Sequence, residues 1–169
     1  MANSHIALLL ASVLISAFCP AEEEESVSGT IVPISMVLNT STHQCEVLVN
    51  HAPVLKVDCY RSASLPRVIA NYSGGFGSLQ QVLVFQELPA GNACNGGPLH
   101  ILAIAADKKP LVADPIDFCG GKDPLISRKG KTLLITLPGG PPNRPIPGST
   151  VLIPTQKWSY KEGLLTRIK

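Results

Sequence analysis

Short apolar runs, separated by clusters of Gly, Pro, Asn, Asp and Ser, make up most of the chain. The runs are rich in Val, Ile and Leu and show almost no helical periodicity, so each predicts a β-strand. We expect an all-β antiparallel meander of about ten short strands, arranged as a sandwich or as propeller-like sheets. The expected strands cover residues 31–38, 45–49, 54–60, 67–72, 79–88, 99–106, 111–113, 125–128, 131–137, 157–161 and 164–168.

Two of these runs differ from the others because neither of their faces is polar. Residues 79–88 are continuously apolar at the centre, and in residues 99–106 both alternating sets of positions are largely apolar. A strand with one face in water shows polar residues at every second position, whereas a strand covered on two sides does not. We therefore expect both runs to be central strands that are buried on both faces.

Turn-forming residues connect the runs. The Asn-His-Ala-Pro sequence at 50–53 predicts the turn of a hairpin, and the glycine-containing pairs at 129–130 and 162–163 predict two more. The glycine-rich stretch at 73–77 predicts a break between strands. Residues 138–147 contain five prolines, which cannot donate regularly to a sheet, so we expect an extended surface loop there.

Four cysteines follow the N-terminal region, and they predict two disulfides. Cys45 and Cys59 flank the first hairpin and should lie nearly opposite each other, which leaves Cys94 to pair with Cys119. Each of the latter two is followed by glycine and then by Pro-Leu and an apolar strand. On the loop-closure model each bridge contributes about 3 kcal/mol. A four-cysteine zinc site is the alternative, but the close Cys-x-x-Cys pairs typical of such sites are absent.

The N-terminal region has the pattern of an export signal. Residues 6–18 form an apolar run of signal-peptide length that is too short to cross a bilayer comfortably, although no Lys or Arg precedes it. A buried core segment, or a lipoprotein acylated at Cys19, are the alternatives. Cleavage after Ala21 would divide the chain into a signal peptide at 1–21, a disordered acidic leader at 22–29 and a single all-β domain at 30–169.

Composition narrows the choice of partners and compartments. Of the 169 residues, 45% are hydrophobic and 15% are charged, and the formal net charge is +2. A net charge this small produces only a weak electrostatic field. It therefore gives no reason to expect nucleic acid or an acidic membrane surface as a partner. With the signal removed we expect no stable membrane span, and the paired cysteines predict a periplasmic or secreted protein.

The sequence contains no signature of a catalytic nucleophile or of a cofactor. The Gly-x-Ser-x-Gly elbow of serine hydrolases is missing. Glu46, Glu87 and Asp117 are candidates for a pair of carboxylates that could act as acid and base on a polymer, but the sequence alone does not pair them. Whether the chain is an enzyme therefore stays open, with a non-enzymatic role favoured, and we expect no cofactor.

Three aspartates in one loop form a weak candidate for a calcium site. Asp114, Asp117 and Asp123 lie close in sequence, yet their spacing lacks the alternation of a calcium-binding loop. Turn formation is the competing explanation, because Asp-Pro pairs commonly begin turns. We expect no other metal ligands.

The residues most typical of an interaction surface come late in the chain. Asn143 and Arg144 lie in the proline-rich loop, and Trp158 and Tyr160 share one face of a predicted strand. Arginine, tryptophan and tyrosine are enriched in binding hot spots. The alternative for the two aromatic residues is a place in the core, which is where strand aromatics commonly pack.

Several segments together resemble exported bacterial all-β proteins of about this length, a group that implies no activity for this chain. The segments are Cys-Asn-Gly-Gly-Pro-Leu at 94–99, Asp-Pro-Ile-Asp-Phe-Cys-Gly-Gly at 114–121, Leu-Pro-Gly-Gly-Pro-Pro-Asn-Arg at 137–144 and Trp-x-Tyr at 158–160.

The sequence favours a non-enzymatic, disulfide-stabilised binding protein of the bacterial periplasm, similar in role to an inhibitor or immunity protein. Its partner would be another envelope or extracellular protein. A hydrolase of envelope polymers with paired carboxylates, and a structural component of the envelope, are the two alternatives.

Overall fold

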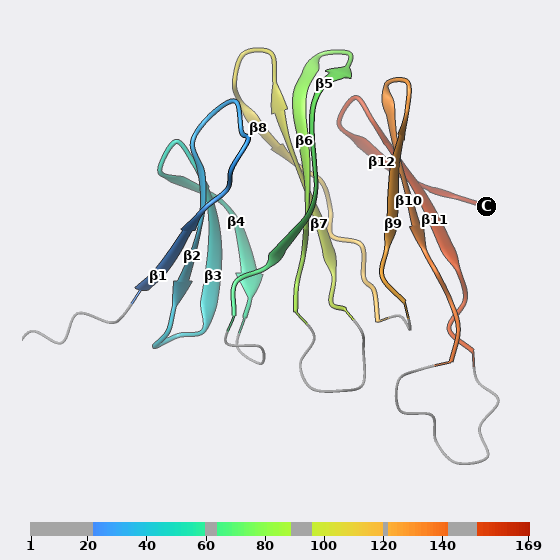
Figure 1. Ribbon diagram of the computed structural model, residues 1–169, viewed down its shortest axis with the longest axis horizontal. Helices are drawn as coiled ribbons and strands as arrows, with labels where there is room; N and C mark the ends of the chain where they lie inside the picture. Colours follow the sequence, from blue (N-terminus) through green and yellow to red (C-terminus); the bar gives the residue numbers. More distant parts are fainter. Residues whose placement is uncertain (1–21, 60–63, 89–95, 120–121, 142–151) are drawn as a thin grey trace, which may run out of the picture.

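The computed structural model describes residues 22–59, 64–88, 96–119, 122–141 and 152–169 (Figure 1). Regular secondary structure within these ranges is β-strand throughout, which confirms the all-β prediction. The strands are β1 (Glu22–Ser26), β2 (Ile34–Asn39), β3 (Gln44–Val49), β4 (Ala52–Asp58), β5 (Arg67–Phe76), β6 (Leu79–Gln86), β7 (Leu99–Ala105), β8 (Pro110–Val112), β9 (Leu125–Lys129), β10 (Thr132–Leu137), β11 (Gln156–Lys161) and β12 (Leu164–Ile168).

The strands form three antiparallel sheets of four strands each. Strands β1–β4 form the N-terminal sheet, β5–β8 the central sheet and β9–β12 the C-terminal sheet, and in each of them neighbouring strands are consecutive in sequence. Figure 1 shows the three sheets standing side by side in one row, with the central sheet between the other two. The sequence left a sandwich and propeller-like sheets open, and the structure shows three meandering sheets packed in one row.

The central sheet is covered on both faces, as the sequence predicts for its two apolar strands. On one side the alternating residues Val82 and Val84 of β6 and Ile101 of β7 share a fully buried cluster with Leu133 and Ile135 of the C-terminal sheet. On the other side lies a second cluster that joins the central sheet to the N-terminal sheet and contains Ile34, Met36, Val47, Val49, Leu83, Phe85, Leu102 and Ile104. The two clusters hold the three sheets together.

A buried glutamine also joins the N-terminal sheet to the central sheet, and nothing in the sequence predicted it. Gln81 of β6 is fully buried, and its Oε1 accepts a hydrogen bond of 2.9 Å from the backbone N–H of Ile31. Its Nε2 donates to the carbonyl of Gly29 at 3.0 Å and to Oδ1 of Asn71 at 2.7 Å. Because both ends of the amide have partners, the burial cost of this polar side chain is offset.

The structure corrects the expectation of a disordered acidic leader. Residues 22–26 form strand β1, which pairs along its whole length with β2, from Glu22 opposite Asn39 to Ser26 opposite Ser35. Backbone groups make this pairing, so the four glutamates can stay exposed to water while the strand forms. β1 is an edge strand of its sheet, and charged side chains at such an edge discourage pairing with other chains.

Strand β5 runs further than the sequence predicts. A break was expected at 73–77, but β5 continues to Phe76 through an irregularity in its pairing with β6. Gly74 and Gly75 have positive φ values of 68° and 81°, which glycine adopts without strain. Arg128 of β9 donates a 2.9 Å hydrogen bond to the carbonyl of Gly74 and lies 5.6 Å from the centre of the Phe76 ring. The glycines therefore bend the strand towards the C-terminal sheet.

Connections of different length emerge at the two ends of the row. Consecutive strands alternate in direction, so all connections from an odd-numbered strand to the next lie at one end, here called the turn end (Figure 1). Four of them are two-residue turns, at 50–51, 77–78, 130–131 and 162–163. The opposite end, here called the loop end, carries the connections 40–43, 59–66, 87–98, 113–124 and 138–155. The longest connections are thus gathered on one side of the scaffold.

Truncating a side chain between two sheets should cost far more than truncating the same side chain on an outer face. Leu83 is 0% exposed and Leu164 is 69% exposed. We expect Leu83→Ala to lower the free energy of unfolding by about 2–5 kcal/mol because it leaves a cavity. Leu164→Ala should change it by less than about 0.5 kcal/mol. Urea unfolding of both variants measures the difference, and equal losses would contradict the double coverage of β6.

Candidate functional site

A disulfide lies at the loop end of the N-terminal sheet. Cys45 of β3 and Cys59, just after β4, are bonded with their Cα atoms 5.7 Å apart, which confirms the predicted pairing. Both are buried, in a small cluster with Leu38 and Val57. The bridge therefore fixes the point at which the chain leaves the N-terminal sheet for the central one.

Cys119 is also disulfide-bonded. Cys94, its predicted partner, lies outside the described residues, so that pairing stays a prediction. The chain just before Cys119 is anchored in the core, because Ile116 and Phe118 are buried between the central and C-terminal sheets. Ile116 also exchanges two backbone hydrogen bonds of 2.9 Å with Leu99 at the start of β7. The 113–124 connection is thus anchored on the core on the N-terminal side of its cysteine.

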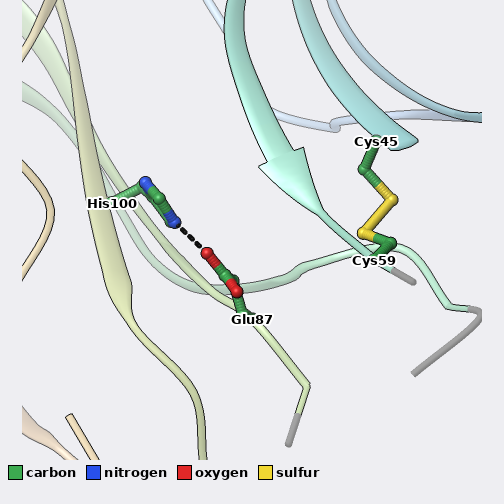
Figure 2. A network of polar contacts seen from close by, with 4 residues as sticks. All are labelled: Cys45, Cys59, Glu87 and His100. Carbon is green, nitrogen blue, oxygen red and sulfur yellow. Dashed lines mark hydrogen bonds and ion pairs between the residues drawn. A yellow bond between two sulfur atoms is a disulfide. The ribbon is translucent and has the colours of Figure 1, made fainter. Parts of the chain in front are cut away.

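A buried polar pair lies at the loop end of the central sheet, near the Cys45–Cys59 bridge (Figure 2). A hydrogen bond of 2.6 Å joins Nε2 of His100 to Oε1 of Glu87, and the two side chains are only 7% and 19% exposed. Nδ1 of His100 is buried and finds no partner among the described residues. The pair links the residue that follows β6 to β7, on the face that the central sheet turns towards the N-terminal sheet.

Glycines let the two ends of the 87–98 connection approach each other closely. The backbone N–H of Gly97 donates to the carbonyl of Glu87 at 2.9 Å, and that of Glu87 donates to the carbonyl of Pro98 at 3.0 Å. A Cβ on Gly97 would lie 2.9 Å from the carbonyl oxygen of Glu87. A Cβ on Gly96 would overlap the side-chain amide of Gln86. The Gly-Gly pair that follows Cys94 in sequence therefore closes the base of this connection.

The base of the 138–155 connection is closed in a similar way. Gly140 and Ile153 exchange two backbone hydrogen bonds of 2.9 and 2.8 Å. A side chain on Gly139 would overlap the carbonyl of Ile153, so only glycine fits at this crossing. Three long connections of the loop end are therefore held at their bases by hydrogen bonds and by core contacts.

A charged recess opens beside these bases. Arg67 at the start of β5 donates to Oε1 of Gln86 at 3.0 Å, and its guanidinium lies 3.5 Å from the carboxylate of Asp123. Arg67 and Asp123 line a recess of about 290 Å³ together with Val68, Ile69 and Pro124. The ion pair is largely exposed, so it contributes less than about 1 kcal/mol to stability and leaves both charges accessible to a ligand.

The structure places the two predicted aromatic residues on the inner face of the C-terminal sheet. Tyr160 is fully buried in the cluster shared with the central sheet. Trp158 is half-buried, its Nε1 donates to Oε1 of Gln156 at 3.2 Å, and Arg167 lies 6.0 Å from its ring centre. A fully buried side chain offers a partner no surface, so of the two roles that the sequence leaves open for Tyr160, the structure shows the place in the core.

Two other predicted binding residues, Asn143 and Arg144, lie outside the described residues, and their role stays a prediction. The calcium hypothesis gains nothing from the geometry. Among the described residues, which include Asp114, Asp117 and Asp123, no group of three His, Cys, Asp or Glu side chains is placed to hold a metal ion.

The structure also separates two of the carboxylates proposed for acid–base chemistry. Glu46 lies on the outward face of the N-terminal sheet and forms a 3.1 Å ion pair with Lys56. Glu87 instead bonds to His100 on the side of the central sheet that faces the N-terminal sheet. These two acids therefore do not flank a common site.

The comparisons with known proteins give no relative. No protein-family model, no curated protein and no solved structure matches the chain. The resemblance to exported bacterial all-β proteins stays a prediction. In the described part of the chain no helix is long and apolar enough to cross a membrane.

Removing the hydroxyl of Tyr160 should stabilise the protein at high pH. The hydroxyl is buried without a partner among the described residues, and burial raises the pKa of the phenol. Above about pH 10 the unfolded chain loses this proton more readily than the folded one, so stability falls as pH rises. We expect Tyr160→Phe to match or exceed the parent near pH 7 and to lose less stability between about pH 9 and 11. Urea unfolding across that range, with parallel losses in both proteins as the contradicting result, measures the effect.

Both disulfides should stabilise the fold. Replacing Cys45 and Cys59 by serine, or Cys94 and Cys119, should lower the free energy of unfolding by about 3 kcal/mol in each case because the unfolded chain gains freedom. Denaturant unfolding under non-reducing conditions compares each double variant with the parent. If the Cys94/Cys119 variant unfolds like the parent, the predicted second bridge is wrong.

Proposed function

We propose that the chain is a non-enzymatic binding protein of the periplasm or the cell exterior, and that its loop end contacts another envelope or extracellular protein. An inhibitor or immunity role against that partner is the specific form of the proposal. The single observation that carries it is the concentration of the long connections at one end of a scaffold whose interior is packed with side chains.

Rigid bases for variable loops are a common design of binding proteins. Loops on a fixed scaffold present their side chains in a defined arrangement, so less conformational entropy is lost when a partner binds. Here the Gly97–Glu87 and Gly140–Ile153 backbone contacts close the bases of two such connections, and the Leu99–Ile116 contact anchors the first part of a third. This arrangement supports the loop end over the turn end as the contact surface.

The disulfide supports a location in the periplasm or outside the cell. The bridge between Cys45 and Cys59 is buried, and disulfides persist in oxidising compartments such as the periplasm and the extracellular space.

Site-directed photo-crosslinking in the cells that produce the protein tests this proposal. A photoreactive amino acid replaces Leu88 or Leu152, which are exposed at the loop end, or Ser78 or Lys131, which are exposed at the turn end and serve as matched controls. We expect one discrete protein adduct from the loop-end positions and none from the turn end.

Two results would count against the proposal. Adducts of equal yield from both ends would mean that the contact is not made by the long connections. Absence of an adduct from every position, in a protein shown by circular dichroism to be folded, would remove the support for a protein partner at the loop end.

A further inference from the structure

The outward face of the N-terminal sheet is acidic. Backbone pairing places Glu24 opposite Val37, Val37 opposite Glu46 and Glu46 opposite Lys56, so these side chains share one face. The alternate positions of β2 and β3 are buried against the central sheet, which makes this face the outward one. It contains a recess of about 280 Å³ whose lining includes Glu22, Val37 and Glu46. We call this surface the acidic face.

The acidic face keeps most of its negative charge uncompensated. Lys56 forms an ion pair of 3.1 Å with Glu46, whereas Glu22 and Glu24 on the edge strand β1 are exposed and form no ion pair with the described residues. Half-buried Val37 lies between Glu24 and Glu46, and half-buried Leu48 lies two positions beyond Glu46 on the same face. The surface therefore combines carboxylates with a small amount of apolar area.

The outward face of the C-terminal sheet carries the opposite charge. Pairing places Lys157 opposite Ile168 and Lys161 opposite Leu164, while the alternate positions of β11 face the central sheet. Lys129 lies on the same face at the end of β9. No acidic residue occupies an outward position in the four described strands of this sheet. We call this surface the basic face.

The basic face is also the most apolar exposed part of the described strands. Leu125, Leu164 and Ile168 on it are 63%, 69% and 42% exposed. Serine and threonine occupy most of the remaining outward positions. The exposed aliphatic side chains give this face apolar area that a partner could cover.

We propose that the acidic face of one copy of this chain stacks on the basic face of a second copy. The two faces lie at opposite ends of the row of sheets (Figure 1), so a second copy would continue the sheet-on-sheet packing that already joins the three sheets of one chain. Opposite charge brings the unlike faces together, and like charge keeps two acidic or two basic faces apart.

Such an interface joins different surfaces of the two copies, so each copy keeps one free face of each kind. Repeated head-to-tail contacts close into a ring when the rotation between copies permits and otherwise form an open filament. Because lysines and glutamates line the contact, its strength depends on salt: the screening length falls from about 10 Å at 0.1 M to about 3 Å at 1 M.

Charge reversal on each face provides the test, with sedimentation velocity as the measurement of self-association. Lys157→Glu with Lys161→Glu makes the basic face acidic, and Glu22→Lys with Glu24→Lys makes the acidic face basic. Each pair alone should weaken self-association about tenfold or more. Mixing the two variants should restore it, because each then offers faces opposite in charge to those of the other.

Matched controls lie on the same elements or at the turn end. Glu23→Lys with Glu25→Lys changes the same strand by the same charge, but on its other side, opposite Leu38 and Met36. Lys108→Glu with Lys131→Glu reverses two exposed lysines of the turn end. Both controls should associate like the parent, and circular dichroism confirms that all variants are folded.

The proposal predicts complexes of the parent that grow with protein concentration and dissociate in 1 M salt. It is overturned if the parent sediments as a monomer up to about millimolar concentration at low salt. It is also overturned if the two face variants associate like the parent, or if their mixture stays monomeric. The loop-end crosslinks described above do not depend on this contact, so the two proposals can fail separately.

Discussion

Burial of both faces of β6 and β7 is the constraint on which the arrangement of the three sheets depends. A strand with apolar side chains on both sides needs a cover on each, and one antiparallel sheet provides only one. Leu83 and Leu102 therefore require the N-terminal sheet, and Val84 and Ile101 require the C-terminal sheet. The outer sheets need only one apolar face each, which leaves their outward faces free to carry charge.

Two polar sites inside this stack lie near the ends of the central strands, where they fix how neighbouring segments meet. Gln81 holds the connection between β1 and β2 at the turn end, and His100 with Glu87 holds the start of the 87–98 connection at the loop end. The two sites differ, because both ends of the Gln81 amide have partners whereas Nδ1 of His100 has none among the described residues. The polar site at the loop end therefore has an unpaired hydrogen-bonding atom among the described residues, and the Gln81 amide at the turn end has partners at both its oxygen and its nitrogen.

The pattern of residue types along the chain predicted the hairpin turns, the buried strands and one disulfide, because side chains decide where these features form. The doubly buried strands β6 and β7 and the Cys45–Cys59 bridge follow from residue types at particular spacings. So do three hairpin turns, which were predicted at 50–53, 129–130 and 162–163 and lie at 50–51, 130–131 and 162–163. The sequence did not predict β1, because backbone pairing lets a strand form from four consecutive glutamates. It also ended β5 too early, because glycines that usually end a strand here allow it to bend.

The candidate site was less predictable than the fold. Cysteine spacing indicated the Cys45–Cys59 bridge, but the sequence left Tyr160 between binding and the core, because alternation shows which residues share a face and not whether that face is covered. The contact of Arg67 with Asp123 joins segments that are far apart in sequence, and no local pattern predicts such a pair. Whether a strand face is covered, and which distant segments contact each other, are decided only when the sheets pack together.

Because every sheet is a meander of consecutive strands, the sheets can form one after another along the chain. Both cysteines of the first bridge lie within residues 44–59, so the N-terminal sheet can be locked before the central strands are available. The pairing contacts within each sheet are local in sequence, which favours rapid formation, and only the packing between sheets has to wait. For β6 and β7 this means a period with one face covered and the other exposed, which ends when the last sheet docks.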